Sequence, residues 1–165
     1  MKHFLALILF LSCIAPAAAQ TSAKEKIDEL LTGWHDAAAR ADFDDYFSKM
    51  AEEAVFIGTD PTENWAKPAF MNWAEPYFIK GKAWSFTTLE RNVFLAEDSQ
   101  LGWFDELLET QMGICRGSGV VSKVDGQWKI KHYVLSIAVP NENVSELTEL
   151  KKDFDLKLIT EFKTR

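Results

Sequence analysis

Three residues in the second half of the sequence could carry out acid–base chemistry: His132 and the adjacent pair Asp105 and Glu106. An imidazole and a carboxylate within hydrogen-bond reach can exchange protons with a bound molecule, which is what general acid–base catalysis requires. Two interpretations are open. Either these residues form such a catalytic pair, or they form a polar pair that closes the edge of the core, because buried polar groups commonly pair without doing chemistry.

The surroundings of His132 follow from a predicted hairpin. Asp125-Gly126 separates two strand-like runs and is typical of a two-residue turn. Counting from this turn places Gly119 opposite His132. It also places Gly117 opposite Val134, so the strand beside the imidazole has no side chains to fill the space there.

A cavity beside His132 also requires lining residues from other segments of the chain. Neighbouring residues of a strand face opposite sides, so one of Asp105 and Glu106 shares the face of His132 in either register. We expect this carboxylate and His132 to line a cavity that helical segments bearing Trp65 and Trp73 partly close. Alternatively, these tryptophans are plain core residues, since aromatic side chains bury large areas.

Arg116, Ser118 and Trp103 complete the predicted ligand-binding set. Arg116 could hold a carboxylate or a phosphate through its planar guanidinium group, or it could pair with Glu109 across a hairpin. Both interpretations are open. His35 is placed on the polar side of its helix and is given no functional role.

No metal and no cofactor are expected. The sequence contains no zinc-ligand spacing, phosphate-binding loop or dinucleotide fingerprint. Only His35 and His132 follow the first 19 residues, too few for a histidine-rich metal site. Asp60-Pro61-Thr62-Glu63 has the pattern of a helix start, with Asp60 as the cap and Glu63 in the first turn.

Helices come first in the predicted element order, and long strands follow. Apolar residues at helical spacing predict a helix over residues 22–41 and a C-terminal amphipathic helix over residues 143–162. A short strand is expected at residues 54–58, and four long strands at residues 83–96, 100–110, 114–124 and 127–139. This order predicts an α+β fold in which a curved antiparallel sheet wraps around the N-terminal helices.

Residues 1–19 are predicted to be a cleaved signal peptide. Lys2, an apolar run that is too short to span a bilayer, and Ala17-Ala18-Ala19 form the three parts of such a leader. An uncleaved anchor is the alternative. Cleavage leaves residues 20–165 as one domain of usual size, exported to the periplasm or secreted. Cys115 then has no cysteine partner, so no intramolecular disulfide is possible.

The chain is acidic. It has 18 Lys and Arg against 25 Asp and Glu, a net charge of −7, and removal of Lys2 with the leader makes it more acidic still. This balance argues against binding to nucleic acid or, after cleavage of the leader, to anionic membrane surfaces.

Several segments together resemble the SnoaL-like branch of the nuclear-transport-factor-2-like superfamily. The likeness spans nearly all of the predicted mature chain up to Pro140 and is carried by Phe56-Ile57-Gly58-Thr59-Asp60 with Glu63 and Trp65, Trp103-Phe104-Asp105-Glu106, Arg116-Gly117-Ser118-Gly119-Val120, Trp128-Lys129-Ile130 and His132-Tyr133-Val134-Leu135-Ser136. The resemblance implies a cone-shaped fold with a pocket in the cone, and a homodimer formed through the outer face of the sheet. It leaves the function open, since the superfamily includes isomerases, dehydratases and cyclases as well as non-catalytic association domains.

Two functions are therefore expected as alternatives. The first is a non-catalytic exported domain whose cone binds a small, partly apolar molecule or a protein partner. The second is a small lyase or isomerase that uses His132 with Asp105 or Glu106.

Overall fold

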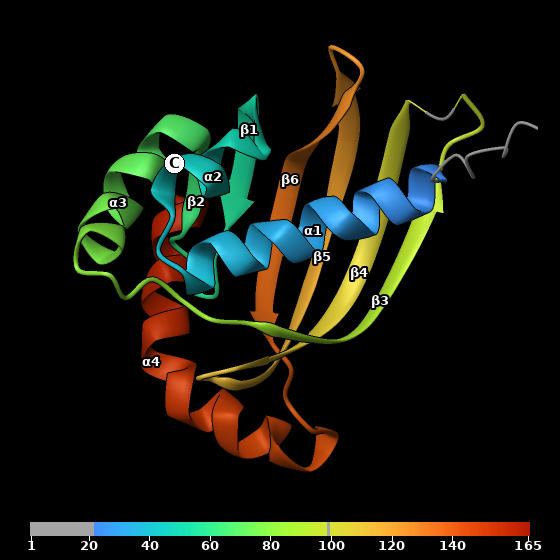
Figure 1. Cartoon of the computed structure of the whole chain (residues 1–165). Coiled ribbons are helices and arrows are strands. Elements are labelled where there is room, and N and C mark those ends of the chain that lie inside the picture. The colour runs from blue at the N-terminus through green and yellow to red at the C-terminus, as the bar shows by residue number, and fades with distance from the viewer. Residues whose placement is uncertain (1–21, 99) are drawn as a thin grey trace, which may run out of the picture.

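The computed structural model describes residues 22–98 and 100–165, so the predicted leader lies outside the described residues. One six-stranded sheet has the order β2-β1-β6-β5-β4-β3 and curves around helix α1 (Figure 1). Neighbouring strands are antiparallel, except that β1 and β6 run parallel. The elements are α1 (Ala23–Ala39), α2 (Phe43–Ser48), β1 (Met50–Ile57), β2 (Asn64–Ala66), α3 (Lys67–Ile79), β3 (Thr87–Leu95), β4 (Leu101–Thr110), β5 (Gly113–Val124), β6 (Gln127–Ile137), a 3₁₀ turn (Asn141–Asn143) and α4 (Val144–Lys163). The predicted α+β class and curved sheet are confirmed.

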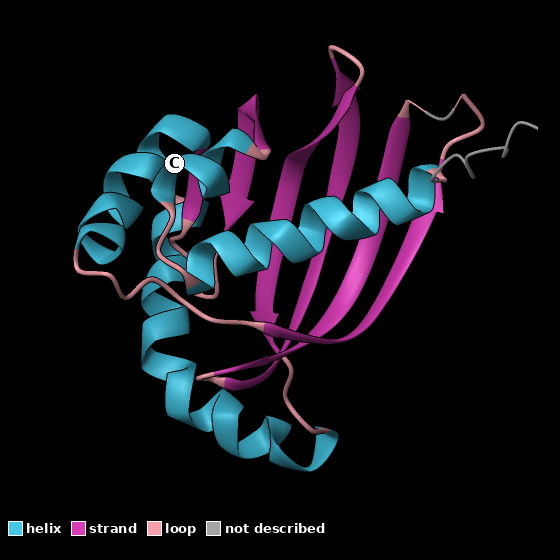
Figure 2. Ribbon diagram, viewed as in Figure 1, coloured by secondary structure: helices cyan, strands magenta, loops and turns pink. Residues whose placement is uncertain are grey.

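Helix α1 begins at a capping box. The Ser22 hydroxyl accepts a hydrogen bond from the Glu25 backbone N–H, and the Glu25 carboxylate accepts one from the Ser22 N–H in return. These two bonds satisfy donors that the first turn of a helix leaves free. The helix then crosses the concave face of the sheet (Figure 2). Its Ile27, Leu31 and Trp34 side chains are buried.

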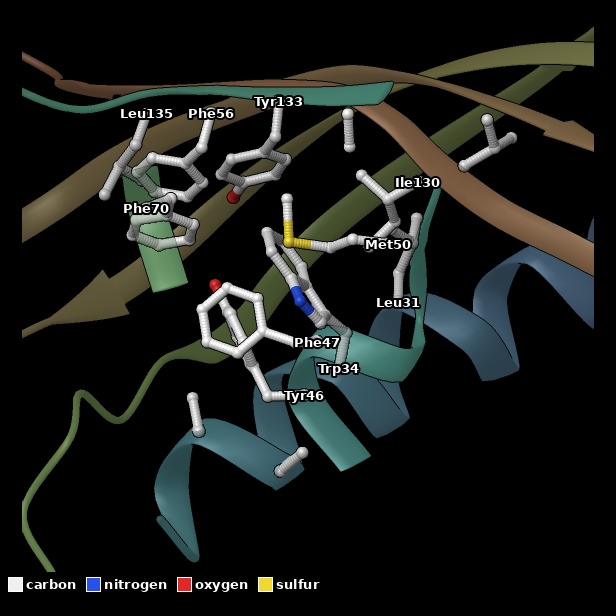
Figure 3. Close-up of a cluster of buried hydrophobic side chains, with 14 of the residues drawn as sticks. Leu31, Trp34, Tyr46, Phe47, Met50, Phe56, Phe70, Ile130, Tyr133 and Leu135 are labelled. Carbon is white, nitrogen blue, oxygen red and sulfur yellow. The ribbon is translucent and has the colours of Figure 1, made fainter. Parts of the chain in front are cut away.

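Aromatic side chains fill the space between the helices and the sheet. Trp34 of α1 stacks on Tyr46 of α2 with ring centroids 4.9 Å apart, and the edge of Tyr133 from β6 meets Trp34 at 4.8 Å. Figure 3 shows these rings together with Phe47, and Phe70 beyond them. The described residues form no disulfide, and Trp34, Tyr46, Tyr133 and Phe70 are the largest fully buried side chains, so their packing contributes strongly to the stability of the fold.

The β5–β6 hairpin corrects the predicted register. Asp125 and Gly126 have positive φ angles of 50° and 79°, as a two-residue hairpin turn of this type requires. The register then shifts by one residue, because Val121 pairs with Ile130 while Val120 pairs with His132. Lys131 is thus the extra residue of a β-bulge, and every side chain beyond it faces the opposite side from the one predicted.

Two further segments differ from the sequence-based prediction. Residues 60–63 do not begin a helix; they form a turn in which Asp60 accepts a hydrogen bond from the Thr62 N–H, and β2 follows directly. Helix α4 forms as expected, but none of its residues is buried, and Leu150 and Phe154 are exposed. Within residues 22–98 and 100–165, no helix has both the length and the apolar character needed to cross a membrane.

Candidate functional site

A cavity of about 170 Å³ opens at the end of the sheet where β1, β2 and α3 meet. The segment between α3 and β3 and the turn between β4 and β5 complete its wall. We call it the aromatic pocket. It is lined by Phe56, Gly58, Thr59, Glu63, Trp65, Phe70, Trp73, Trp84, Phe86, Gln111, Met112 and Leu135.

The aromatic pocket takes its name from six rings packed around it. Trp65 stacks on Trp73 with centroids 4.8 Å apart, and Phe56 stacks on Phe70 at 4.1 Å. Figure 3 shows Phe56 and Phe70 beside Leu135 at one end of the buried cluster. The deeper rings are core residues, whereas Trp73 is 40% exposed at the mouth. The pocket is therefore a continuation of the hydrophobic core that reaches solvent.

Glu63 is the one charged side chain that lines the aromatic pocket. Its Oε2 accepts a hydrogen bond from the Asp60 backbone N–H at 3.2 Å, and no Lys, Arg or His among the described residues forms an ion pair with it. A side chain at Gly58 would collide with this carboxylate. Glycine at position 58 thus allows the carboxylate to lie close to the backbone.

A second polar group lies deeper, between α1 and the sheet. Glu106 is completely buried, and its Oε1 accepts hydrogen bonds from His35 Nε2 and from the Tyr133 hydroxyl, both at 2.9 Å. Its Oε2 accepts a hydrogen bond from Arg91 Nε at 2.9 Å. Arg91 also reaches Oδ1 of Asp28 on α1 at 2.8 Å. We call Glu106, His35, Arg91 and Tyr133 the buried polar cluster.

The charge state of the cluster follows from these contacts. Burial by itself raises the pKa of Glu106, but hydrogen bonds and positive charge from His35 and Arg91 outweigh burial and hold that pKa below its ordinary value. An ionised carboxylate only accepts hydrogen bonds, so the His35 Nε2 carries a proton. Burial and the nearby Glu106 charge raise the pKa of Tyr133 well above its usual value, and its hydroxyl stays a donor.

Close packing at Gly117 makes room for this arrangement. Gly117 pairs with Glu106 on one side and Leu135 on the other, and a Cβ at this position would collide with the Tyr133 hydroxyl. The expectation that Gly117 leaves space on β5 is therefore correct. The space is filled by Tyr133, however, and not by a ligand beside His132.

The predicted site residues divide between the two faces of the sheet. Trp65 and Trp73 line the aromatic pocket, and Glu106 faces the inside of the cone. The others lie on the outer face, namely His132, Asp105, Arg116, Ser118 and Trp103. The predicted pairing of His132 with a carboxylate inside the cone is wrong, because the bulge at Lys131 turns the imidazole outward.

The outer-face residues have other neighbours. Asp105 accepts a hydrogen bond from the Asn92 side chain at 3.1 Å, and Trp103 stacks on Phe94 at 5.7 Å. Arg116 lies opposite Leu107 in the register and forms no ion pair with Glu109 among the described contacts. The predicted pairing of Arg116 with Glu109 is therefore wrong, and Arg116 lies on the opposite face of the sheet from Glu106.

His35 and Arg91 are the members of the buried cluster that sequence reasoning missed. His35 is 4% exposed, which corrects its placement on a polar helix face. It follows Ile27 and Leu31 at four-residue intervals, so it continues their buried stripe. Arg91 alternates with Val93 and Leu95 on the inner side of β3. A charged residue in an apolar alternation was the available signal for a buried ion pair.

Other parts of the described surface are less suited to a small molecule. A groove of about 540 Å³ lies between the start of α1 and β3, but charged surface side chains, among them Lys24, Glu25 and Asp28, line it. Within the described part of the chain, no group of three or more His, Cys, Asp or Glu side chains could hold a metal ion. The aromatic pocket is the more enclosed and more apolar candidate for a small molecule.

Known proteins resemble this chain in sequence and in fold. Residues 27–140, more than half of the chain, match the family model of the SnoaL-like domain. The chain belongs to this family. The resemblance inferred from the sequence motifs is thereby confirmed for this SnoaL-like domain, whose matched region contains both the aromatic pocket and the buried polar cluster.

Solved structures share the fold at low sequence identity. An NTF2-like protein of unknown function from Pseudomonas putida has a TM-score of 0.62 and 18% identity, covering 73% of this chain and 90% of that chain. A domain of unknown function with a cystatin-like fold from Nostoc punctiforme has a TM-score of 0.60 and 19% identity, covering 88% and 100%. A protein from Novosphingobium aromaticivorans described as a candidate aromatic ring hydroxylase has a TM-score of 0.59 and 15% identity, covering 73% and 94%. At these identities the likeness establishes the fold alone, and a search of curated proteins gave no sequence match.

Proposed function

We propose that this SnoaL-like domain binds a small, partly apolar molecule in the aromatic pocket. The observation that carries the proposal is a cavity walled by six aromatic rings that opens to solvent beside the half-buried Glu63. Ligand sites are typically concave and mostly apolar, with a few polar groups that fix orientation. Thr59, Glu63 and Gln111 supply such groups here.

The size of the pocket limits the ligand. An apolar cavity of about 150 Å³ is known to hold benzene, and the aromatic pocket is slightly larger at about 170 Å³. A molecule with one ring or a compact branched head therefore fits, whereas a fused polycyclic body does not. Larger ligands would extend through the mouth past Trp73.

The same geometry favours binding over acid–base catalysis. The buried His35–Glu106 pair is absent from the wall of the aromatic pocket, and Glu106 is fully engaged by three donors. A general base also works best with a pKa near the operating pH, whereas the contacts around Glu106 lower its pKa. The buried polar cluster is better explained as part of the core.

Binding can be tested with single-ring probes. We expect phenol and benzyl alcohol to bind in isothermal titration calorimetry, and native mass spectrometry of the purified protein to detect a retained small molecule. Met112→Trp places a bulky ring in the pocket wall and should abolish both signals. Gln127→Trp, at the distant β5–β6 turn, serves as the matched control and should retain them. Undiminished binding by Met112→Trp would contradict the proposal.

Compartment and assembly are a further part of the proposal. The Lys2, apolar and Ala-rich segments of the sequence support export through a cleaved leader. A homodimer through the outer face of the sheet is supported by exposed apolar side chains there, among them Phe94, Leu101 and Trp103. Contiguous exposed apolar surface commonly marks an interaction site.

A further inference from the structure

We infer that the aromatic pocket selects a ligand with a compact organic cation, such as a quaternary or alkylated ammonium group. This inference rests on the proposed binding function and adds the charge of the ligand. It follows from three properties of the pocket taken together: a carboxylate with no cationic partner among the described residues, an aromatic wall, and few hydrogen-bond acceptors away from solvent.

The first property is the charge of the wall. Glu63 is half-buried among the lining residues, and its described contacts contain one backbone donor and no ion pair. A neutral apolar ligand would cover this carboxylate without replacing the water that solvates it, which is unfavourable. A cationic group would instead pair with it. An anionic ligand would meet repulsion from Glu63 and find no Lys, Arg or His in the wall.

The second property is the aromatic composition. The faces of aromatic rings carry negative electrostatic potential, so they attract cations that lie within about 6 Å of the ring centre. Tryptophan gives the strongest such attraction, and Trp65, Trp73 and Trp84 all line the pocket. Trp65 and Trp73 belong to one continuous stack that Phe70 extends inward.

The third property is the small supply of hydrogen-bond acceptors away from solvent. A primary ammonium carries three N–H donors that all need acceptors, whereas Glu63 is the half-buried oxygen acceptor among the lining side chains, and Thr59 and Gln111 are exposed to water. An alkylated ammonium has methyl groups in place of those donors. Its methyl groups pack against the aromatic rings, and its positive charge is attracted to the Glu63 carboxylate. The pocket chemistry thus favours an alkylated over a primary ammonium group.

The test compares two probes that share one shape. Choline is titrated calorimetrically beside its uncharged isostere, in which a tert-butyl group replaces the trimethylammonium group, with phenol as a neutral aromatic probe. We expect choline to bind at least about tenfold more tightly than the isostere. Glu63→Gln keeps the size of the side chain and should reduce this ratio at least about threefold, and the preference that remains is due to the aromatic rings. Glu142→Gln, an equal change of net charge in the exposed 3₁₀ turn, should leave the ratio unchanged.

The outcomes separate the two proposals. Equal binding of choline and its isostere, or binding of phenol alone, overturns the inferred charge selectivity while the proposed binding function stands. A choline preference that is undiminished in Glu63→Gln overturns the role of Glu63. If the folded wild-type protein binds none of the three probes, the proposed function itself is overturned, and the inference with it.

Discussion

The carboxylate of Glu106 and the imidazole of His35 are joined by a hydrogen bond of 2.9 Å between residues that are 71 positions apart in the chain. This bond connects β4 to α1. Arg91 on β3 contacts the same two elements, since it forms ion pairs with Glu106 of β4 and with Asp28 of α1. The buried polar cluster therefore fixes the position of α1 across the concave face of the sheet.

Substitution of Glu106 should be strongly destabilising. In Glu106→Gln the charge of Arg91 loses its buried partner, and breaking a buried ion pair typically costs about 3–5 kcal/mol. We expect a loss of this size in the free energy of unfolding, measured by urea denaturation at neutral pH. Ligand binding at the aromatic pocket should persist in the fraction that is folded. A loss below about 1 kcal/mol, the usual range of a surface pair, would contradict the proposed structural role.

The same carboxylate should make stability depend on pH. Its pKa is lower in the folded protein than the ordinary value of 4.5, so the unfolded chain binds a proton more readily than the folded protein. The stabilisation is therefore fully present above about pH 4.5 and is lost as the pH falls through the lower folded-state pKa. Urea denaturation at stepped pH should show a steeper acid-side decline for the wild type than for Glu106→Gln.

Glu53→Gln is the control for this pH dependence. The hydrogen bond and charge of Lys131 also lower the pKa of Glu53, but Glu53 is exposed and water screens its ion pair. Its substitution should change the acid-side slope less than Glu106→Gln does. Equal slopes for the wild type and Glu106→Gln would show that Glu106 does not account for the acid sensitivity.

The fold could be predicted from sequence because its signals are local. Helical spacing in residues 22–41 and the Asp125-Gly126 turn identify α1 and the β5–β6 hairpin without any knowledge of their partners. The chemistry of the site depends on something less local, namely which face each strand residue occupies. One extra residue at Lys131 reverses that assignment for His132, and a bulge of this kind has no strong signature in a single sequence.

Part of the candidate site could nevertheless be predicted from the sequence. Trp65 and Trp73 are predicted from the sequence to line a pocket, and they do. The sequence leaves open which of Asp105 and Glu106 faces inward, and the structure places Glu106 there. His35 was missed because a histidine next to a polar face resembles a surface residue until its partner is known. That partner lies 71 positions away, and only the tertiary fold brings the two together.

Gly117 should tolerate no side chain. In Gly117→Ala the added methyl group would overlap the Tyr133 hydroxyl and crowd Glu106, so the hydrogen bond between them must shift. Overpacking of a close-packed core typically costs about 1–3 kcal/mol. Thermal unfolding should show this loss, whereas Ser118→Ala, one residue further on the outer face, should be nearly neutral. Equal melting temperatures for the two variants would contradict the packing argument.

The leader should be cleaved after Ala19. The capping box of α1 begins at Ser22, so this cleavage leaves every residue of the first helix in the mature chain. We expect the intact mass of exported protein to correspond to residues 20–165. Replacement of Ala17 and Ala19 by bulky residues should block processing, because the peptidase recognises small side chains there. An exported species that retains residues 1–19 would contradict this prediction.

Assembly through the outer face is tested most directly at Trp103. This side chain is 46% exposed and stacks on Phe94, so the two rings present a joint apolar surface on β3 and β4. In a symmetric dimer each such surface faces its own copy, and a new carboxylate would appear twice in one interface. We therefore expect light scattering to find a dimer for the wild type and a monomer for Trp103→Glu at the same concentration. Ile79→Glu, at the exposed end of α3, introduces the same charge away from the sheet and should remain dimeric. A wild-type protein that stays monomeric at high concentration would contradict the proposed dimer, and the exposed apolar outer face would then need a different partner.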